Sequence, residues 1–379
     1  MNNLYRHLAS RFIRRNLLPG GKNLLPMKLT VASTFMCNHQ CTICGIWTIY
    51  RDAPAKRQEE LTIEDYGRVF EELKDSLLFL DWGGGEPFLR NDMGSILRLA
   101  ARTCPKLSSV VITTNGFLTS RIVDTVGRLA EDMPQIRWAI GVSLDGDEPT
   151  HDAVRGKLGA FKAAVATIKG LRELATRRNN VEIKLSYTLC SANAGRFEAF
   201  HHDVLKPLGL AAGDVGFNLE HTGNLFQTDT AGVKTVGHVA ENQFRSAVQR
   251  DITYIMQQNR QEKLGMSQRL KSFYREFFLR RIPGYLGNPK TMVIPCQASR
   301  NSLYLDPYGN LYPCIVWDRR LGHVRDGVKN VLSSDGVAGA RKLIDSGKCP
   351  VCWNACEVIP TLLTSWRMPG CVMWSLLHR

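Results

Sequence analysis

The sequence predicts an α/β fold, in which a partial (β/α)6 barrel of the TIM type precedes a small cysteine-rich α+β domain. Two observations support this prediction. Six strand-like runs alternate with helical patterns between residues 27 and 221, and six of the eleven cysteines fall in residues 291–379. Such alternation indicates a parallel sheet with right-handed crossovers. Six units are fewer than the eight that close a full barrel.

The predicted elements follow one another closely along the chain. The strands cover residues 28–33, 77–82, 108–114, 136–144, 181–189 and 215–220. The helices between them cover residues 62–76, 92–102, 119–131, 160–176 and 195–206. Thr62 precedes acidic residues and is a typical helix N-cap. In barrels of this type the chemistry lies at the C-terminal ends of the strands.

Composition and charge narrow the class of protein. The hydrophobic content of 44% allows a sizeable core in a chain of 379 residues. We find neither a long apolar run nor an apolar segment with a cleavage site at the start, so we expect a cytoplasmic protein in which clustered cysteines bind metal. The net charge of +14 is spread widely without interleaved aromatic residues, which does not favour nucleic-acid binding.

Residues 1–26 are basic and amphipathic. Leu4, Leu8 and Phe12 share one face of a predicted helix, which residues 19–21 (Pro-Gly-Gly) end. Such a helix covers one end of the following domain or lies on an anionic membrane surface. We favour the first interpretation and keep peripheral membrane contact as the alternative.

Residues 222–290 interrupt the alternation. They are polar and basic, with helical patterns at 236–259 and 266–281, and residues 283–284 (Pro-Gly) are expected to end the second helix. We interpret this segment as a helical connector or lid.

A short loop after the first predicted strand carries Cys37, Cys41 and Cys44 at C-x3-C-x2-C spacing. Three thiolates on one loop can hold three irons of a [4Fe–4S] cluster and leave the fourth iron without a protein ligand. A structural zinc site that uses a fourth ligand such as His39 is the alternative.

A glycine-rich segment, residues 82–87 (Trp-Gly-Gly-Gly-Glu-Pro), follows the second predicted strand. Glycines allow the backbone to approach a ligand closely, and Glu86 can accept hydrogen bonds from an ammonium group. The cysteine loop and this segment together resemble the signature of the radical S-adenosylmethionine (radical SAM) enzymes.

The resemblance implies cofactors and a chemistry. In that family the open iron chelates the methionine part of SAM, and a Gly-Gly-Glu-Pro motif contacts its amino group. It therefore implies a catalytic [4Fe–4S] cluster on Cys37, Cys41 and Cys44, with SAM beside Gly84, Gly85, Glu86 and Pro87. A reduced cluster of this kind cleaves SAM to a 5′-deoxyadenosyl radical, which takes a hydrogen atom from a substrate.

Further SAM contacts are expected where later strands end. In the family, polar groups at the fourth strand end meet the ribose or carboxylate of SAM, which here points to Ser143 and Asp145. Arg155 is a candidate partner for the carboxylate, and a surface ion pair with a nearby acidic residue is its alternative. Asn193, beyond the fifth strand, is a further candidate.

The C-terminal cysteines resemble the SPASM and shorter twitch extensions that bind auxiliary [Fe–S] clusters in radical SAM enzymes. A hairpin of residues 301–305 and 311–316 is expected to present one of them. One auxiliary [4Fe–4S] cluster is expected on Cys296, Cys314, Cys349 and Cys352. Cys356 is a further candidate ligand, and with Cys371 it is either spare or part of a second cluster; a zinc ribbon is the alternative. Cys104 and Cys190 are expected to be buried core thiols.

Three functional hypotheses follow. The first is a radical SAM oxidoreductase acting on a small molecule (a sugar, lipid or natural-product intermediate), giving oxidation, bond formation or, if Cys356 or Cys371 quenched the substrate radical, epimerisation. The second is a maturase that modifies a peptide or protein, and the third is a zinc-stapled binding protein. Flavodoxin or ferredoxin is the expected electron donor. The twitch-like spacing, and the expectation that no leader-binding domain precedes the barrel, favour a small molecule.

Overall fold

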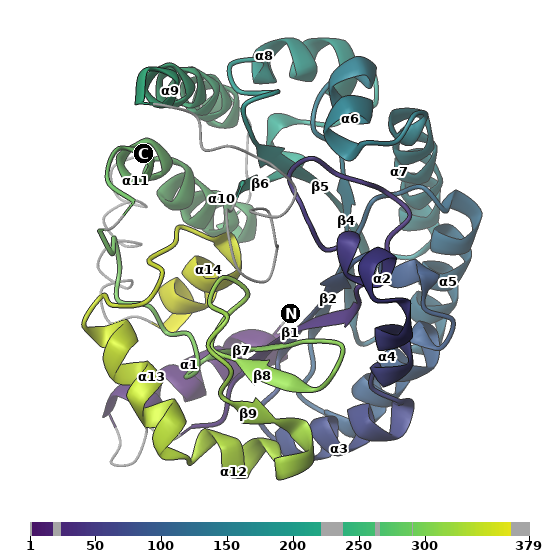
Figure 1. The fold of residues 1–379 in the computed structure, drawn as a ribbon. Helices are drawn as coiled ribbons and strands as arrows, with labels where there is room; N and C mark the ends of the chain where they lie inside the picture. The colour runs from purple at the N-terminus through teal and green to yellow at the C-terminus, as the bar shows by residue number, and fades with distance from the viewer. Residues whose placement is uncertain (1, 18–23, 221–237, 262–265, 290, 365–379) are drawn as a thin grey trace.

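Nine strands form one sheet in the order β6-β5-β4-β3-β2-β1-β7-β8-β9 (Figure 1). This computed structural model describes residues 2–17, 24–220, 238–261, 266–289 and 291–364. The first six strands are β1 Lys28–Thr34, β2 Phe79–Gly84, β3 Ser109–Thr114, β4 Arg137–Ser143, β5 Val181–Leu189 and β6 Val215–Leu219. All neighbours among them pair in parallel, so the predicted α/β fold with a parallel sheet is confirmed.

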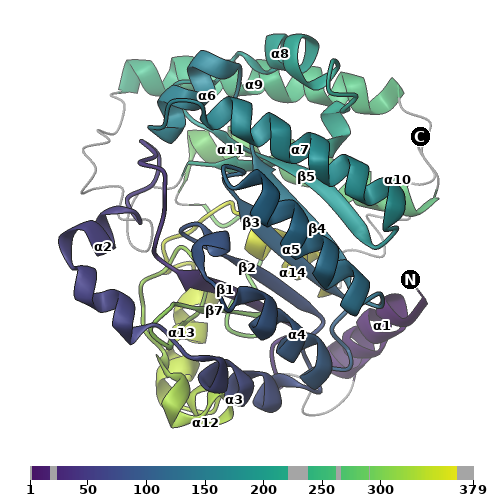
Figure 2. The ribbon, with the colours of Figure 1, turned by 90° about the vertical axis from the view of Figure 1, so that its right-hand side faces the viewer.

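Helices cover the outer face of the parallel strands (Figure 2). They are α3 Ile63–Leu73, α4 Met93–Thr103, α5 Thr119–Asp132 and α7 Ala160–Arg177, with the short α8 Phe197–Phe200 farther along. Thr62 caps α3 as predicted. Its side chain accepts a hydrogen bond from the backbone nitrogen of Asp65, and the side chain of Asp65 accepts one from the backbone nitrogen of Thr62.

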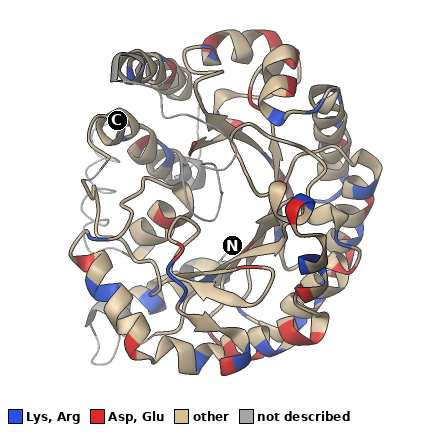
Figure 3. Cartoon of the chain, in the orientation of Figure 1, with Lys and Arg blue, Asp and Glu red and all other residues tan. Residues whose placement is uncertain are grey.

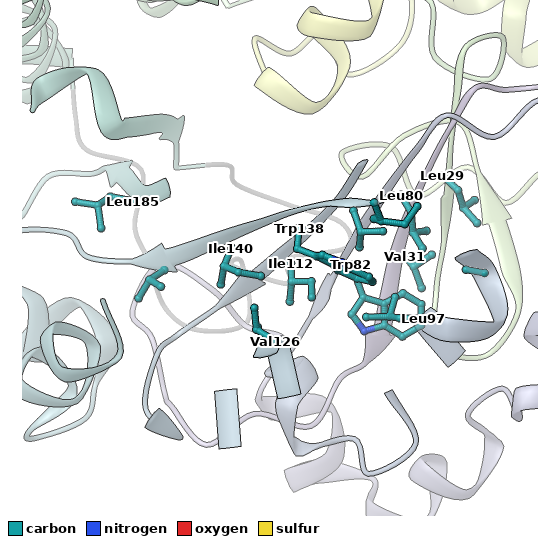
Figure 4. Packing of buried hydrophobic residues seen from close by; sticks show 14 of the residues in the cluster. Leu29, Val31, Leu80, Trp82, Leu97, Ile112, Val126, Trp138, Ile140 and Leu185 are labelled. Atoms are coloured by element: carbon teal, nitrogen blue, oxygen red, sulfur yellow. The ribbon is translucent and has the colours of Figure 1, made fainter. Parts of the chain in front are cut away.

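The core lies between the sheet and these helices. Alternate strand residues such as Leu80, Trp82 and Ile112 point toward the helices and pack with Leu97 and Val126 (Figure 4). Fully burying each such side chain stabilises the fold by about 1.5–3 kcal/mol. The opposite face of the strands is not covered by these helices and faces the interior, where the candidate site lies.

Two short helices between β1 and β5 were not predicted from the sequence. They are α2 Thr48–Asp52, after the cysteine loop, and α6 Glu148–Arg155, after β4. The side chain of Asp147 caps α6, with Pro149 in its first turn, and Gly156 ends it in the left-handed conformation. These are ordinary helix signals, but eight residues between two stronger patterns are too few to show a period.

Three helices follow β6: α9 His238–Gln261, α10 Met266–Leu279 and α11 Ile282–Gly287. The prediction that Pro283 and Gly284 end a helix was wrong, because α10 ends earlier and Pro283 lies in the first turn of α11, where proline is well tolerated. Asp251 of α9 accepts hydrogen bonds from the backbone nitrogens of Gly195 (2.7 Å) and Phe197 (3.1 Å), which fastens α9 beside the end of β5.

The predicted C-terminal hairpin extends the same sheet. Its strands are β7 Ser302–Leu305 and β8 Asn310–Tyr312, followed by β9 Gly322–His323. β7 pairs in parallel with β1, so that Thr30 lies opposite Tyr304. The last elements are α12 Val328–Leu332, α13 Asp335–Asp345 and α14 Ala355–Thr364. The sequence did not reveal that the hairpin lies beside β1.

The amphipathic helix α1 (Asn2–Leu17) contacts α14. The guanidinium of Arg11 donates to the backbone oxygen of Leu25 at 2.6 Å, on the side where β1 begins. Figure 3 shows basic and acidic residues interspersed over the outer helices. Within the described ranges, no helix is long and apolar enough to cross a membrane.

Candidate active site

A cavity of about 290 Å³ lies on the inner face of the sheet. Cys37, Cys41 and Cys44 all line it, together with the glycines at and just beyond the end of β2 and polar residues from β3, β4, β5 and β6. The cysteine loop follows β1, so it lies at the C-terminal end of the parallel strands, as predicted. The structure thus brings the three cysteines and the glycines together around one space.

The cysteine loop is folded by its own backbone. The amide of Cys44 donates to the oxygen of Cys41 at 3.3 Å, and the indole nitrogen of Trp47 donates to the same oxygen at 3.3 Å. Burial raises the pKa of Cys37 to about 12 and that of Cys44 to about 11. The free thiols therefore hold their protons near neutral pH, and metal binding would release them.

Helix α6 supports this loop from the side. The amide of Gln40 donates to the oxygen of Arg155 (3.2 Å), and that of Thr42 to the oxygen of Val154 (2.9 Å). Gly156 has φ of +57°, and a Cβ there would lie 2.2 Å from the oxygen of Gln40. The position therefore requires glycine for both its conformation and its close contact.

Arg155 links α6, the end of β4 and the cysteine loop. Its Nε and Nη2 lie 2.7 and 2.6 Å from the same carboxylate oxygen of Asp145, and its Nη1 lies 4.0 Å from the sulfur of Cys41. Asp145 is fully buried, and 11% of the Arg155 side chain is exposed. The alternative of a surface ion pair for Arg155 was therefore wrong. Arg155 places a positive charge beside the cysteine that it faces.

The glycine segment packs against the start of the cysteine loop. The amides of Gly85 and Glu86 donate at 2.7 Å to the oxygens of Thr34 and Met36. A Cβ on Gly85 would lie 2.2 Å from the oxygen of Met36, so only glycine fits. Gly84, with φ of +110°, lines the cavity with Gly85.

The Glu86 side chain lies beneath this segment, fully buried, and is not among the cavity-lining residues. It accepts hydrogen bonds from the amides of Phe88 (3.1 Å) and Asn115 (2.8 Å) and from the hydroxyl of Thr114 (2.8 Å). Burial raises its pKa to about 7. Pro87 is also buried and begins the short turn that follows. Direct contact of Glu86 and Pro87 with SAM stays a prediction.

Ser143 and Asn193, the other predicted SAM residues, differ in position. Ser143 lines the cavity at the end of β4. Asn193 is fully buried behind the wall, where its amide nitrogen donates to the backbone oxygens of Asp145 (3.0 Å) and Thr188 (2.8 Å). Asn193 thus positions the segment after β4 from outside the cavity.

His39 is the clearest unpaired polar group of the loop. Its ring is 1% exposed and packs edge-on against Phe117, and neither ring nitrogen has a hydrogen-bond partner among the described residues. Burial lowers its pKa to about 4, so the ring is neutral near pH 7. His39 lines the cavity, where a ligand would supply the missing hydrogen bonds.

Several cavity residues were not predicted from the sequence. They are polar or aromatic side chains of the strand interiors and of the C-terminal region, and they include Thr30, Asp81, Ser186, Asn218, Glu220, Tyr304 and Asn354. A polar residue within a strand that is otherwise buried, such as Asp81, is the signal that could have identified some of them.

A second, smaller cavity of about 40 Å³ gathers Cys296, Cys314, Cys349 and Cys352. Its other walls are mostly apolar, and burial raises the pKa of Cys296 to about 12. Trp353 closes one side, donating its indole hydrogen to the oxygen of Phe278 of α10 at 2.9 Å.

The other cysteines lie elsewhere. Cys356 does not line this second cavity but the central one, and Cys371 lies outside the described residues. Cys104 and Cys190 are each 1% exposed, which confirms the prediction that they are buried thiols.

The arrangement of the thiols bears on the choice between zinc and a cluster. In the part of the chain that the structure describes, no three His, Cys, Asp or Glu side chains are placed to share a single metal ion. A tetrahedral zinc site needs its ligands around one ion, whereas a cubane distributes them over several irons. The assignment of both sets of cysteines to clusters therefore stays a prediction.

Residues 31–186 match the sequence profile of the radical SAM superfamily. Pre-heme d1 synthase of Dinoroseobacter shibae is 30% identical over 164 residues, which are 42% of this chain and 36% of that protein. The sporulation killing factor maturation protein SkfB of Bacillus subtilis is 27% identical over 172 residues, 45% of this chain and 37% of that protein.

Among solved structures, native anSMEcpe with bound AdoMet and Cp18Cys peptide is similar to this chain, with a TM-score of 0.57 and 17% identity over 84% of this chain and 83% of that one. This similarity supports the α/β fold with its parallel sheet. The profile and the relatives assign residues 31–186 to the radical SAM superfamily of enzymes. The matched segments span little more than a third of the two curated relatives.

Proposed function

We propose that this protein is a radical SAM enzyme, built on a partial (β/α)6 barrel, which reductively cleaves SAM and abstracts a hydrogen atom from a bound substrate. One observation carries the proposal: three thiols from one loop, one buried and two half-buried, and a glycine segment line the same cavity at the C-terminal ends of parallel strands. This is where barrels of the type hold their chemistry.

In this proposal Cys37, Cys41 and Cys44 hold a [4Fe–4S] cluster, and SAM lies beside Gly84 and Gly85. When bound, the cluster and SAM supply the 5′-deoxyadenosyl radical. The protein supplies position: Asp145 fixes Arg155 beside Cys41, and Glu86 holds the turns after β2 and β3 together. His39 offers a neutral ring nitrogen to a ligand in the cavity.

We further propose that Cys296, Cys314, Cys349 and Cys352 hold one auxiliary [4Fe–4S] cluster of the twitch type. Four thiols around one small, mainly apolar cavity support this assignment. An apolar surround that excludes solvent is one of the factors that tune the potential of such clusters. A cluster there would take part in electron transfer to or from the substrate.

For the substrate we favour a small polar molecule over a peptide. The interior beyond the cysteine loop carries Asp81, Asn218 and Glu220, and residues of the C-terminal region, Tyr304 and Asn354, form another part of the wall. Hydroxyl or amine groups of a sugar or natural-product intermediate would satisfy such side chains. A peptide substrate is the second candidate, which the similarity to a peptide-maturation protein supports.

The proposal includes a low-potential electron donor of the flavodoxin or ferredoxin class. It also includes a location in the reducing cytoplasm, because the clusters need free thiols. Contact with a membrane through α1 stays a lesser proposal. The packing of Arg11 against Leu25 supports the interpretation of α1 as a cover for one end of the domain.

The proposed function is tested by SAM cleavage after anaerobic reconstitution with iron and sulfide. We expect 5′-deoxyadenosine on reduction, and deuterium transfer into it from labelled candidate substrates, which identifies the broken C–H bond. Labelled sugars and labelled peptides are compared in parallel. Absence of 5′-deoxyadenosine from the reduced, reconstituted enzyme would overturn the proposal.

A further inference from the structure

Cys356 lies apart from the four cysteines with which its sequence position groups it. Those four line the small cavity, whereas Cys356 lines the central one. The strongest charges near its thiol belong to Lys28, Asp81 and Glu357. The chain turns into α14 at Ala355, and the amide of Cys356 donates to the side-chain oxygen of Asn354 at 2.8 Å. Cys356 is therefore not positioned as a ligand of the four-cysteine site.

Within the central cavity, Cys356 lies toward the end opposite the cysteine loop. Its backbone oxygen accepts a hydrogen bond of 2.9 Å from the Nζ of Lys28, the first residue of β1. The loop follows Thr34, the last residue of that strand. The Nζ of Lys28 also contacts Asp81, which lies opposite Thr30, and four steps of about 3.3 Å separate Thr30 from Thr34 by roughly 13 Å. A molecule in the cavity would thus lie between the loop and Cys356.

Unpaired polar groups in the same wall indicate that a ligand binds there. The hydroxyl of Thr30 has no hydrogen-bond partner among the described residues, although only 8% of the residue is exposed. Asp81 and Tyr304, its partners on the adjacent strands, also line the cavity. A buried polar group left unpaired costs about 1–3 kcal/mol. With His39 at the loop end, these groups frame a site for a polar molecule.

We propose that Cys356 is a hydrogen-atom donor to a carbon-centred substrate radical, which makes the reaction a redox-neutral inversion at carbon, an epimerisation. The inference rests on the proposed function, which supplies the radical. The S–H bond breaks homolytically, and the hydrogen atom forms a new C–H bond on the face opposite the one that was attacked. The resulting thiyl radical then accepts one electron from the flavodoxin- or ferredoxin-class donor and one proton from solvent.

The surroundings of Cys356 suit this role. Burial raises the pKa of its thiol to about 11, so the sulfur carries its hydrogen near neutral pH. The Nζ of Lys28, 2.6 Å from a carboxylate oxygen of Asp81, lies beside the backbone of Cys356. An S–H bond is weaker than an aliphatic C–H bond, so transfer to a carbon radical is favourable. Amide N–H and alcohol O–H bonds in the wall are too strong to compete, whereas the phenolic O–H bond of Tyr304 is similar in strength to the S–H bond.

The first test needs no knowledge of the substrate. The reconstituted enzyme is exchanged into thiol-free ²H₂O buffer and given only SAM and dithionite. The deuterium on the Cys356 sulfur is among the most weakly bound exchangeable hydrogens of the cavity, and only its label depends on Cys356, whereas that of the Tyr304 phenol does not. We therefore expect singly deuterated 5′-deoxyadenosine from the wild type and loss of this label in Cys356→Ser. Cys104→Ser, which changes a buried thiol outside the cavity, is expected to keep the label.

Iron content provides a second readout that does not depend on turnover. We expect Cys356→Ser to retain the iron of the wild type, and Cys352→Ser to lose about four irons per chain. Equal label in wild type and Cys356→Ser would overturn the donor role, as would loss of iron from Cys356→Ser. Absence of 5′-deoxyadenosine from the wild type would instead overturn the proposed function, and the donor role with it.

Discussion

The chain contains two three-cysteine runs with mirrored spacing, C-x3-C-x2-C at 37–44 and C-x2-C-x3-C at 349–356. All three thiols of the first run line the central cavity, because the run stays an irregular loop and α6 supports it. The second run is split, because its chain enters α14 before Cys356. Two of its thiols line one cavity and the third lines another.

This difference shows that cysteine spacing alone does not determine a ligand set. The backbone between the cysteines decides which of them share a space. Cys356 therefore became a candidate for chemistry in the central cavity, although its spacing suggested a metal ligand. The predictions below test whether the two runs really have these different roles.

The largest effect is expected in the first run. Cys41→Ala should abolish SAM cleavage and remove about four irons per chain, because the loop cannot hold a cubane with two thiols. The measurement is 5′-deoxyadenosine by mass spectrometry together with iron and sulfide content. Cys104→Ala is the control, since it also removes a buried thiol. Undiminished cleavage by Cys41→Ala would overturn the assignment of the first run.

A smaller effect on cleavage is expected in the second run. Cys352→Ala should also lose about four irons, but some SAM cleavage should remain, uncoupled from substrate, because the first cluster stays intact. Product formation and 5′-deoxyadenosine are measured in the same reaction. If Cys352→Ala kept its full iron content, the auxiliary cluster would have to be placed elsewhere.

Arg155→Lys tests the support of the first run without removing a thiol. A lysine cannot bring two nitrogens to Asp145 while a third faces Cys41, so we expect a loss of about 10–100-fold in SAM cleavage. Arg98→Lys is the matched control, because Arg98 forms an exposed ion pair with Asp132 at 2.6 Å. Equal activity of the two variants would show that Arg155 has no positioning role.

The extent of sequence-based prediction differs between these regions for physical reasons. The alternation of strands and helices predicted the six parallel strands, because buried strands and amphipathic helices have periods that the sequence displays. The loop with Cys37 was predicted as a unit, because its three cysteines are neighbours along the chain. The pairing of β7 with β1 was not predicted, since it joins residues that are far apart in sequence.

Side-chain roles were harder to predict than positions. Glu86 and Asn193 were both predicted to contact SAM, and this contact stays a prediction; the structure adds that each is buried and hydrogen-bonded to the protein itself. Burial of that kind depends on which hydrogen-bonding groups the neighbouring strands place around the side chain. A single sequence does not show which strands are neighbours. The partnership of Arg155 with Asp145 was missed because the unpredicted helix α6 brings them together.

The smallest effect is expected in the pH dependence of stability, from two buried acids, one beside each run. Glu86 lies near the first run, and Glu357 lies in the wall of the small cavity. Burial raises the pKa of each from 4.5 to about 7. In this pH window the folded protein therefore holds a proton that the unfolded chain releases. The free energy of unfolding should fall as pH rises from about 4.5 to about 7, and stay lower above it.

Replacing either acid by glutamine removes that proton. The wild type should lose up to about 3 kcal/mol relative to Glu86→Gln across the window, from about 1.4 kcal/mol for each pKa unit. Denaturation curves collected from pH 4 to pH 8 measure the difference, with Glu357→Gln as the counterpart at the second run. Parallel pH profiles for wild type and Glu86→Gln would mean that Glu86 is ionised throughout, so that its three hydrogen-bond donors outweigh its burial.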